Sequence, residues 1–162
     1  MNSMTGEILV NKNDIINIDD NKIKEKVFNS IRLLIKNDFY LLEIGANERS
    51  IAHKLAEYLQ QQFHDWHVDC EYNRHGIEIK KLGEARVYPD IIIHLRNTPF
   101  NLLVIELKCS NENYEGDIEK LKKFTDQNGE FKYKLGLFLK ILDKEIKEMI
   151  WFKNGQQQEN FT

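Results

Sequence analysis

The chain has 162 residues, of which 41% are apolar and 30% are charged. This length predicts one domain spanning residues 1–162, which buries about 70% of the surface of the unfolded chain and needs no metal or disulfide to fold. Its 23 Lys and Arg against 26 Asp and Glu give a net charge of -3, which excludes a protein that coats nucleic acid through bulk positive charge. A local basic face is still compatible with this sum.

The cysteines and the N-terminus bear on the cellular setting. Cys70 and Cys109 lack CxxC spacing, so we expect neither a disulfide scaffold nor a cysteine zinc site, and a reducing compartment suits them. Residues 1–10 lack the basic-then-apolar profile of a signal peptide, and no run approaches the roughly 20 apolar residues of a membrane span. We therefore expect a cytoplasmic protein without a membrane partner.

Two helices are expected in the first part of the chain. Apolar residues recur at helical spacing after Asp19 and Asp20, which supply an N-cap and early negative charge, and this helix should end before Phe39. The apolar run within residues 38–46 is too short for its periodicity to assign. A second helix should begin at the capping residue Asn47 and continue to about residue 63.

Strands dominate the rest of the chain. Alternation of apolar and polar residues from 68 to 73 predicts a strand with one buried face, and a polar connection follows from 74 to 86. The apolar runs 87–95 and 102–109 predict an antiparallel hairpin. A helix from about 117 to 125 and strands at 133–142 and 145–152 complete the expected order.

Charged residues interrupt the apolar strands of this hairpin. Asp90 lies in the first strand, and Glu106 and Lys108 share one face of the second. A turn symmetric about Thr98 would place Asp90 opposite Glu106, whereas a shift of the turn by half a residue would put them on opposite faces. Facing carboxylates repel each other, and a divalent cation held by their oxygens would convert that repulsion into a binding site.

Each of these residues also has a simpler interpretation. Asp90 could be a strand-entry residue after Pro89, and Glu106 with Lys108 could occupy the solvated face of an edge strand. Glu48 lies on the apolar stripe of the second helix and points toward the sheet, but an acid at this position also stabilises a helix N-terminus. Lys108 is a compact cation that can orient or deprotonate a water and offset charge on a phosphorus.

The pattern resembles the PD-(D/E)XK nuclease superfamily. Pro89-Asp90 is followed sixteen residues later by the Glu of Glu106-Leu-Lys108 on the adjacent strand, after a helix bearing Glu48. The expected elements from about 47 to 142 resemble its restriction-endonuclease-like αβββαβ core, an α/β (α+β) fold with a mixed central sheet flanked by helices. Here an N-terminal helix and a C-terminal strand are added. The runs 47–51 and 70–74 are similar to small bacterial members of uncharacterised or defence-associated type.

The resemblance implies roles for individual residues. Asp90, Glu106 and the carbonyl of Leu107 would bind Mg2+ or Mn2+, Glu48 would be the helical acid of the metal site, and Lys108 would be the catalytic lysine. We therefore expect a metal-dependent nuclease, with DNA favoured over RNA as the substrate and a homodimer or partner subunit as an option. Two alternatives are an inactive nuclease-fold module that binds nucleic acid or a partner protein, and an enzyme that hydrolyses another phosphoester.

Further charged residues could assist such a site. Those that could contact backbone phosphates, if they are not simply a solvated loop, are Arg74, His75, Lys80, Lys81 and Arg86. Asp117 and Lys120 could position Lys108 or a phosphate, but we favour a surface ion pair between residues three apart on a helix. For His94 we favour a hydrogen-bonded structural role over metal ligation.

Overall fold

The computed structural model describes residues 12–72, 74–75, 78–79, 81–82 and 85–159. These residues contain a six-stranded mixed sheet in the order β1-β6-β7-β8-β9-β10. Its strands are β1 (His67–Cys70), β6 (Ile91–His94), β7 (Asn101–Lys108), β8 (Leu135–Leu142), β9 (Glu145–Lys153) and β10 (Gln156–Gln157). Neighbouring strands are antiparallel except for β7 and β8, which run parallel and are connected through a helix. The expected mixed sheet flanked by helices is thus confirmed.

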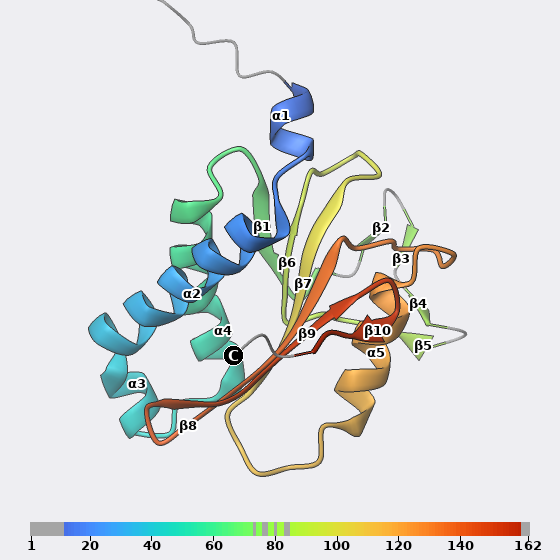
Figure 1. Ribbon diagram of the computed structural model, residues 1–162. Coiled ribbons are helices and arrows are strands. Elements are labelled where there is room, and N and C mark those ends of the chain that lie inside the picture. Colours follow the sequence, from blue (N-terminus) through green and yellow to red (C-terminus); the bar gives the residue numbers. More distant parts are fainter. Residues whose placement is uncertain (1–11, 73, 76–77, 80, 83–84, 160–162) are drawn as a thin grey trace, which may run out of the picture.

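Helices cover both faces of the sheet (Figure 1). They are α1 (Lys12–Ile16), α2 (Asp20–Asn37), α3 (Phe39–Glu43), α4 (Glu48–Gln62) and α5 (Glu115–Thr125). The helices α2 and α4 lie on one side, and α5 lies on the other. From α4 onward the main elements follow the order α4, β1, β6, β7, α5, β8 and β9, which agrees with the expected order. Within the described part of the chain, no helix is both long and apolar enough to cross a membrane.

The helix boundaries follow from their capping residues. The Asp19 carboxylate accepts the backbone N–H of Asn21 at 2.9 Å, and the Asn47 side chain accepts that of Ser50 at 2.8 Å. The α2 and α4 helices therefore begin and end close to the predicted positions. The run that periodicity left unassigned forms the short helix α3, in which no residue is buried.

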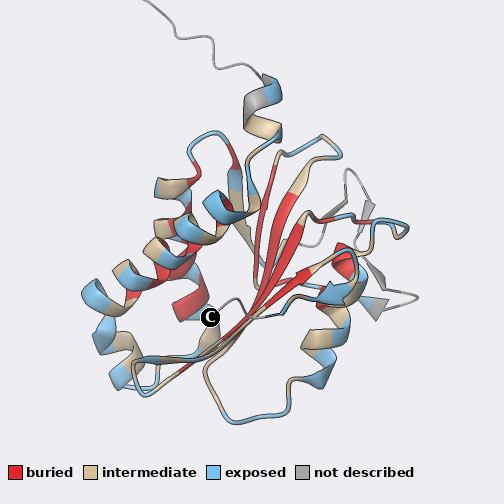
Figure 2. Ribbon diagram, viewed as in Figure 1, coloured by how far each residue is buried: buried red, intermediate tan, exposed pale blue. Residues whose placement is uncertain are grey.

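Two apolar layers fix the faces of the sheet. Leu103, Ile105 and Leu107 of β7 pack in the core against α2 and α4, whereas Val104 packs in the core on the α5 side. This alternation confirms the predicted assignment of faces along β7, because Glu106 shares the α5 side with Val104. Figure 2 shows the buried residues concentrated in the central strands.

The hairpin of β6 and β7 has the register on which the site prediction depends. Ile91 pairs with Ile105 and Ile93 pairs with Leu103, and the pairing shifts by one residue between Ile93 and His94. The turn is therefore not fully symmetric, but the irregularity lies beyond Ile93. Continuing the ladder from Ile91 places Asp90 opposite Glu106.

The connection between β1 and β6 differs from the expected loop. It contains the two-residue strands β2 (Arg74–His75), β3 (Glu78–Ile79), β4 (Lys81–Leu82) and β5 (Ala85–Arg86). They pair as β2 with β3 and β4 with β5, outside the main sheet. The expected strand 87–95 is also shorter, since β6 begins only after Pro89, which has no N–H to donate to a ladder.

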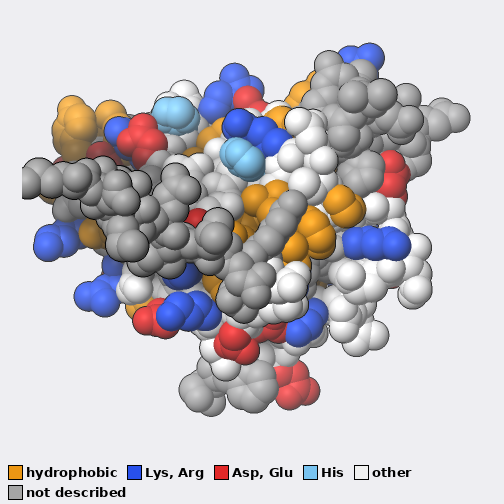
Figure 3. Space-filling model, turned by 90° about the horizontal axis from the view of Figure 1, so that it is seen from above, with side chains coloured by type: hydrophobic (Ala, Val, Ile, Leu, Met, Phe, Trp, Pro, Cys, Tyr) orange, Lys and Arg blue, Asp and Glu red, His pale blue; other side chains and the backbone are white. Residues whose placement is uncertain are grey.

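The two ends of the sheet differ. The interrupting charges belong to the C-terminal half of β7, a strand that runs downward in Figure 1. Figure 3 views the opposite end, where apolar side chains lie near the centre with Lys, Arg and His side chains around them.

Candidate metal centre

The candidate site lies where β7 ends and where β6, α4 and α5 begin. Glu48 is the first residue of α4, Asp90 immediately precedes β6, and Glu106 and Lys108 belong to the end of β7. The α5 helix begins seven residues after β7 and returns along the sheet, which brings Lys120 to Glu106. Side chains from the hairpin of β6 and β7 and from two helices that precede and follow it thus meet at one end of the strands.

Asp90 and Glu106 form a carboxyl pair in which Asp90 is partly buried and Glu106 is buried. One Asp90 oxygen, Oδ2, accepts the backbone N–H of Leu107 at 2.7 Å. The side chain of Glu106 is 3% exposed, and its Oε2 accepts a hydrogen bond from Lys120 at 3.0 Å. Its other oxygen, Oε1, is buried and has no hydrogen-bond partner among the described residues. An unpaired buried oxygen is costly, so this atom suggests that a ligand completes the site.

Burial and mutual repulsion raise the pKa values of both carboxyl groups. Burial raises the pKa of Asp90 to about 6, against the effect of the Leu107 N–H, and the negative charge of Glu48 adds to the rise. For Glu106, burial is again the largest cause and the charge of Asp90 the next, and together they raise the pKa to about 8. Near pH 7 Glu106 therefore retains its proton unless a cation replaces it, whereas Asp90, with a pKa below 7, is mostly ionised.

Glu48 reaches from α4 to the end of β7. Its Oε2 accepts the backbone N–H of Cys109 at 2.8 Å, and its Oε1 lies 3.6 Å from Nζ of Lys108. Glu48 thus contacts the Glu-x-Lys strand as well as starting its helix. Lys108 also lies 3.5 Å from Oδ2 of Asp117. Burial lowers the pKa of Lys108, but the charges of Asp117 and Glu48 outweigh that effect and hold it above its ordinary value. Lys108 is therefore an ammonium group suited to stabilising charge, and not to accepting a proton.

The prediction for Asp117 and Lys120 was only partly right. The two residues form the expected ion pair at 2.9 Å, but the side chain of Asp117 is 16% exposed and both residues face the acid pair. Burial lowers the pKa of Lys120, while Glu106 and Asp117 raise it to about 12. Spacing alone indicated an ion pair, and the approach of α5 to β7 that buries it depends on tertiary packing.

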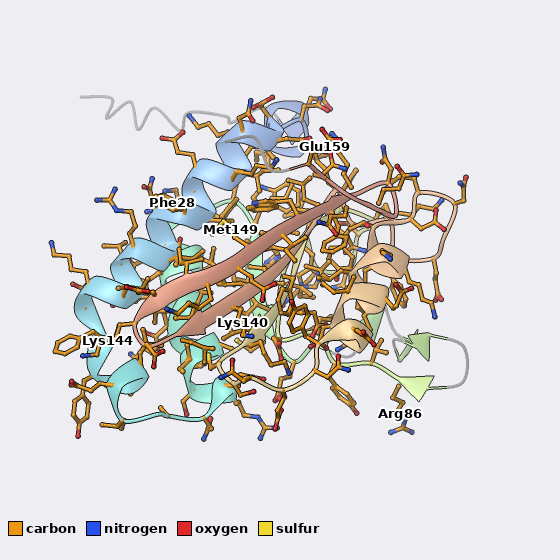
Figure 4. The ribbon with its side chains drawn as sticks, turned by 60° about the horizontal axis from the view of Figure 1, so that its bottom comes forward. Phe28, Arg86, Lys140, Lys144, Met149 and Glu159 are labelled. Carbon is orange, nitrogen blue, oxygen red and sulfur yellow. The ribbon has the colours of Figure 1, made fainter. Side chains whose placement is uncertain are left out.

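Lys140, which was not predicted as a site residue, lies at the same end of the strands. Lys140 of β8 pairs with Lys108 in the parallel ladder, so the two side chains lie side by side at the ends of neighbouring strands. Nζ of Lys140 lies 3.8 Å from Oε1 of Glu148 and 5.4 Å from the centre of the Tyr114 ring. Figure 4 shows Lys140 among the elements of the site, with Arg86 projecting at the periphery.

The proposed phosphate contacts are described only in part. Arg86 is exposed, whereas Lys80 lies outside the described residues. The backbones of Arg74, His75 and Lys81 lie in the short paired strands, and their side chains are outside the described part.

His94 belongs to a separate cluster. Its Nε2 lies 2.7 Å from Oδ2 of Asp69, which also accepts a hydrogen bond from Nε of Arg96 at 2.9 Å. Burial raises the pKa of Asp69, but the hydrogen bonds from Arg96 and His94 outweigh it and hold the pKa below its ordinary value. His94 is thus hydrogen-bonded within the fold, as the favoured interpretation expected.

Two hard carboxyl donors lie at this site, but they do not make a complete set of ligands for a divalent cation. Among the described residues, no three His, Cys, Asp or Glu side chains are grouped closely enough to hold an ion. Asp90 and Glu106 nevertheless offer hard oxygens with raised pKa values, and Glu106 Oε1 has no hydrogen-bond partner in the described part of the chain. These two side chains, with the Leu107 carbonyl, could hold Mg2+ or Mn2+, while Glu48 contacts the end of β7 beside them.

Comparison with known proteins does not add to this description. No protein-family model matches the chain, and no curated protein matches it significantly.

Proposed function

We propose that the protein is a metal-dependent nuclease of the PD-(D/E)XK type, which hydrolyses phosphodiester bonds of DNA. The observation that carries the proposal is the pair of Asp90 and the buried Glu106 beside the ammonium of Lys108, with one Glu106 oxygen that has no hydrogen-bond partner among the residues that the structure describes. The order α4, β1, β6, β7, α5 and β8 supports a restriction-endonuclease-like arrangement.

The residues of the site divide the work of hydrolysis. Asp90 and Glu106 would hold Mg2+ or Mn2+, which would supply Lewis-acid polarisation of the phosphate and an activated water. Glu106, whose pKa is raised to about 8, would give up its proton on binding the cation. Lys108, held by Glu48 and Asp117, stabilises the charge that develops at the phosphorus and orients the attacking water. Because the described residues form one such site, cleavage of both DNA strands at one locus would require a homodimer or a partner subunit.

A cleavage assay tests the proposal. Supercoiled plasmid is incubated with the protein in Mg2+ or Mn2+, and nicked and linear products are measured over time. We expect cleavage by the wild type and a loss of about 10²–10³-fold in Asp90→Asn and in Lys108→Met, since each removes a charge from the reacting centre. Lys122→Gln is the matched control, because Lys122 pairs with Glu119 on the solvent side of α5. Cleavage that survives in both site variants would refute the assignment.

A second function is favoured by the contacts of the three acids. Asp90 accepts the Leu107 N–H, Glu48 accepts the Cys109 N–H, and Glu106 accepts the Lys120 ammonium. Each of the three acids thus already has a hydrogen-bond donor within the protein, which also suits a catalytically inactive module that binds nucleic acid or a partner protein. Titration with Mn2+ separates the two functions. Nucleic-acid binding without any Mn2+ binding would favour the module, whereas Mn2+ binding that Asp90→Asn abolishes would favour the nuclease.

A further inference from the structure

The Glu106 carboxylate has two differently occupied sides. Its Oε2 accepts a hydrogen bond from Lys120 at 3.0 Å, while its buried Oε1 has no hydrogen-bond partner among the described residues. The lysine comes from α5, which packs on the face of the sheet to which Glu106 points. We propose that Lys120 takes the place of a second metal ion, so that the site binds a single divalent cation. This inference rests on the proposed metal-dependent function.

The position of Lys120 supports this role. Its Nζ lies between Oε2 of Glu106 and Oδ1 of Asp117, at 3.0 and 2.9 Å, and so bridges two carboxylates as a metal ion does. Asp90 and the Oε1 side of Glu106 would hold the first cation, because Lys120 occupies the Oε2 side. A second ion at Oε2 would first have to displace an ammonium that two carboxylates hold.

The charges of the cluster agree with one divalent ion. The cluster contains two ammonium groups, from Lys108 and Lys120, and four carboxyl groups, from Glu48, Asp90, Glu106 and Asp117. When all six are ionised, the net charge is two negative charges. The adjoining pair of Lys140 and Glu148 adds no net charge. One divalent cation therefore neutralises the free site before substrate binds, and a second would leave an excess of positive charge in a partly buried region.

The helix holds Lys120 in place. Leu121, the next residue, is fully buried against the sheet, so α5 is fixed where its lysine faces Glu106. Asp117, one turn earlier, contacts both Lys120 and Lys108. Lys120 is thus a positioning residue that holds Glu106 and Asp117 while the cation occupies the other side.

The number of bound ions tests this inference. Mn2+ binding to the full chain is measured by electron paramagnetic resonance and by isothermal titration calorimetry in the wild type, Lys120→Arg and Lys120→Gln, with Lys122→Gln as the control. We expect one Mn2+ per chain in the wild type, in Lys120→Arg and in the control. Lys120→Gln, which loses a positive charge, is expected to bind a second Mn2+, and its cleavage should fall about 10–100-fold and be restored by arginine.

Other outcomes overturn the inference. Two ions of similar affinity in the wild type would refute it while leaving Asp90-dependent cleavage, and hence the proposed function, intact. A folded Lys120→Gln that binds one Mn2+ or none would show that Lys120 does not occupy a cation position. Failure of the wild type to bind Mn2+ or to cleave DNA would refute both proposals together. Circular dichroism and the unfolding midpoint identify variants that retain the fold.

Discussion

Replacing Glu106 with glutamine should stabilise the metal-free protein at alkaline pH. In the folded protein the pKa of Glu106 rises to about 8 from its ordinary 4.5, because burial and Asp90 disfavour the charged form. The protonated carboxyl is thus favoured in the folded state relative to the unfolded state. Below pH 4.5 Glu106 is protonated in both states and does not lower the free energy of unfolding. Its ionisation lowers that free energy progressively as pH rises from 4.5 to about 8, and by a constant amount at higher pH.

The magnitude follows from the same two values. Each pKa unit corresponds to about 1.4 kcal/mol, so ionising Glu106 lowers the free energy of unfolding by about 5 kcal/mol at pH 8.5. Glu106→Gln removes this dependence because the amide does not ionise. The amide also places a buried N–H₂ group in the site at a cost of about 1–3 kcal/mol, but that cost does not change with pH.

The two proteins are therefore compared by how the difference between their free energies of unfolding changes with pH. Urea unfolding of wild type and Glu106→Gln is measured in EDTA at pH 4.5, 6.5 and 8.5. The free energy of unfolding of the variant should gain about 5 kcal/mol relative to wild type across this range. A difference that stays constant with pH would show that folding does not raise the pKa of Glu106, and a wild type that gains stability relative to the variant as pH rises would show that the ionised pair with Lys120 stabilises the fold. Either result would refute the reasoning.

Three further outcomes are expected. Mg2+ affinity should rise between about pH 6 and 8, because the cation must replace protons on Asp90 and Glu106; calorimetry in buffers of different ionisation enthalpy should detect proton release, and its absence would contradict the assigned ligands. Asp69→Asn should lower the free energy of unfolding at pH 7 by about 2–3 kcal/mol, since Asp69 accepts charged hydrogen bonds from Arg96, and this loss should shrink below pH 4; urea unfolding that shows no loss would contradict it. Gly136→Ala should cost about 1–3 kcal/mol and reduce cleavage, because a Cβ there would lie 3.0 Å from Cγ2 of Thr125 and push α5 away from β8; Gly116→Ala, with open space around it, is the control, and equal effects of the two would exclude this explanation.

Local patterns were sufficient to predict most elements of the fold. Capping residues such as Asn47 and the long apolar faces of α2 and α4 act within the helix itself, so their signal is present in the sequence. The short paired strands at 74–86 were not predicted because each has only two residues, too few for any alternation to be recognised. The parallel pairing of β7 with β8 also has no local signal, since it depends on how α5 crosses the sheet.

Of the contacts at the candidate site, the sequence was sufficient to predict the pairing of Asp90 with Glu106 but not the contact of Lys120. Period-two alternation and the compact hairpin turn were enough to bring Asp90 opposite Glu106, because the register is set within sixteen residues. The lysine that contacts Glu106 was not identified. Lys120 shares no strand with the acids, and only the docking of α5 turns a commonplace helical ion pair into a bridge between two carboxylates.

The connectivity of the site has a consequence for the order in which the protein folds. Asp90 and Glu106 are joined by a single hairpin, which can form early because few residues separate its strands. The Glu48 contact with Cys109 closes 61 residues, and Lys120 arrives only when α5 docks on the sheet. The two acids thus face each other before the Lys120 ammonium reaches Glu106. Refolding in EDTA is therefore expected to be faster at pH 6 than at pH 8, so that the residues assigned to cation binding also make the folding rate depend on protons.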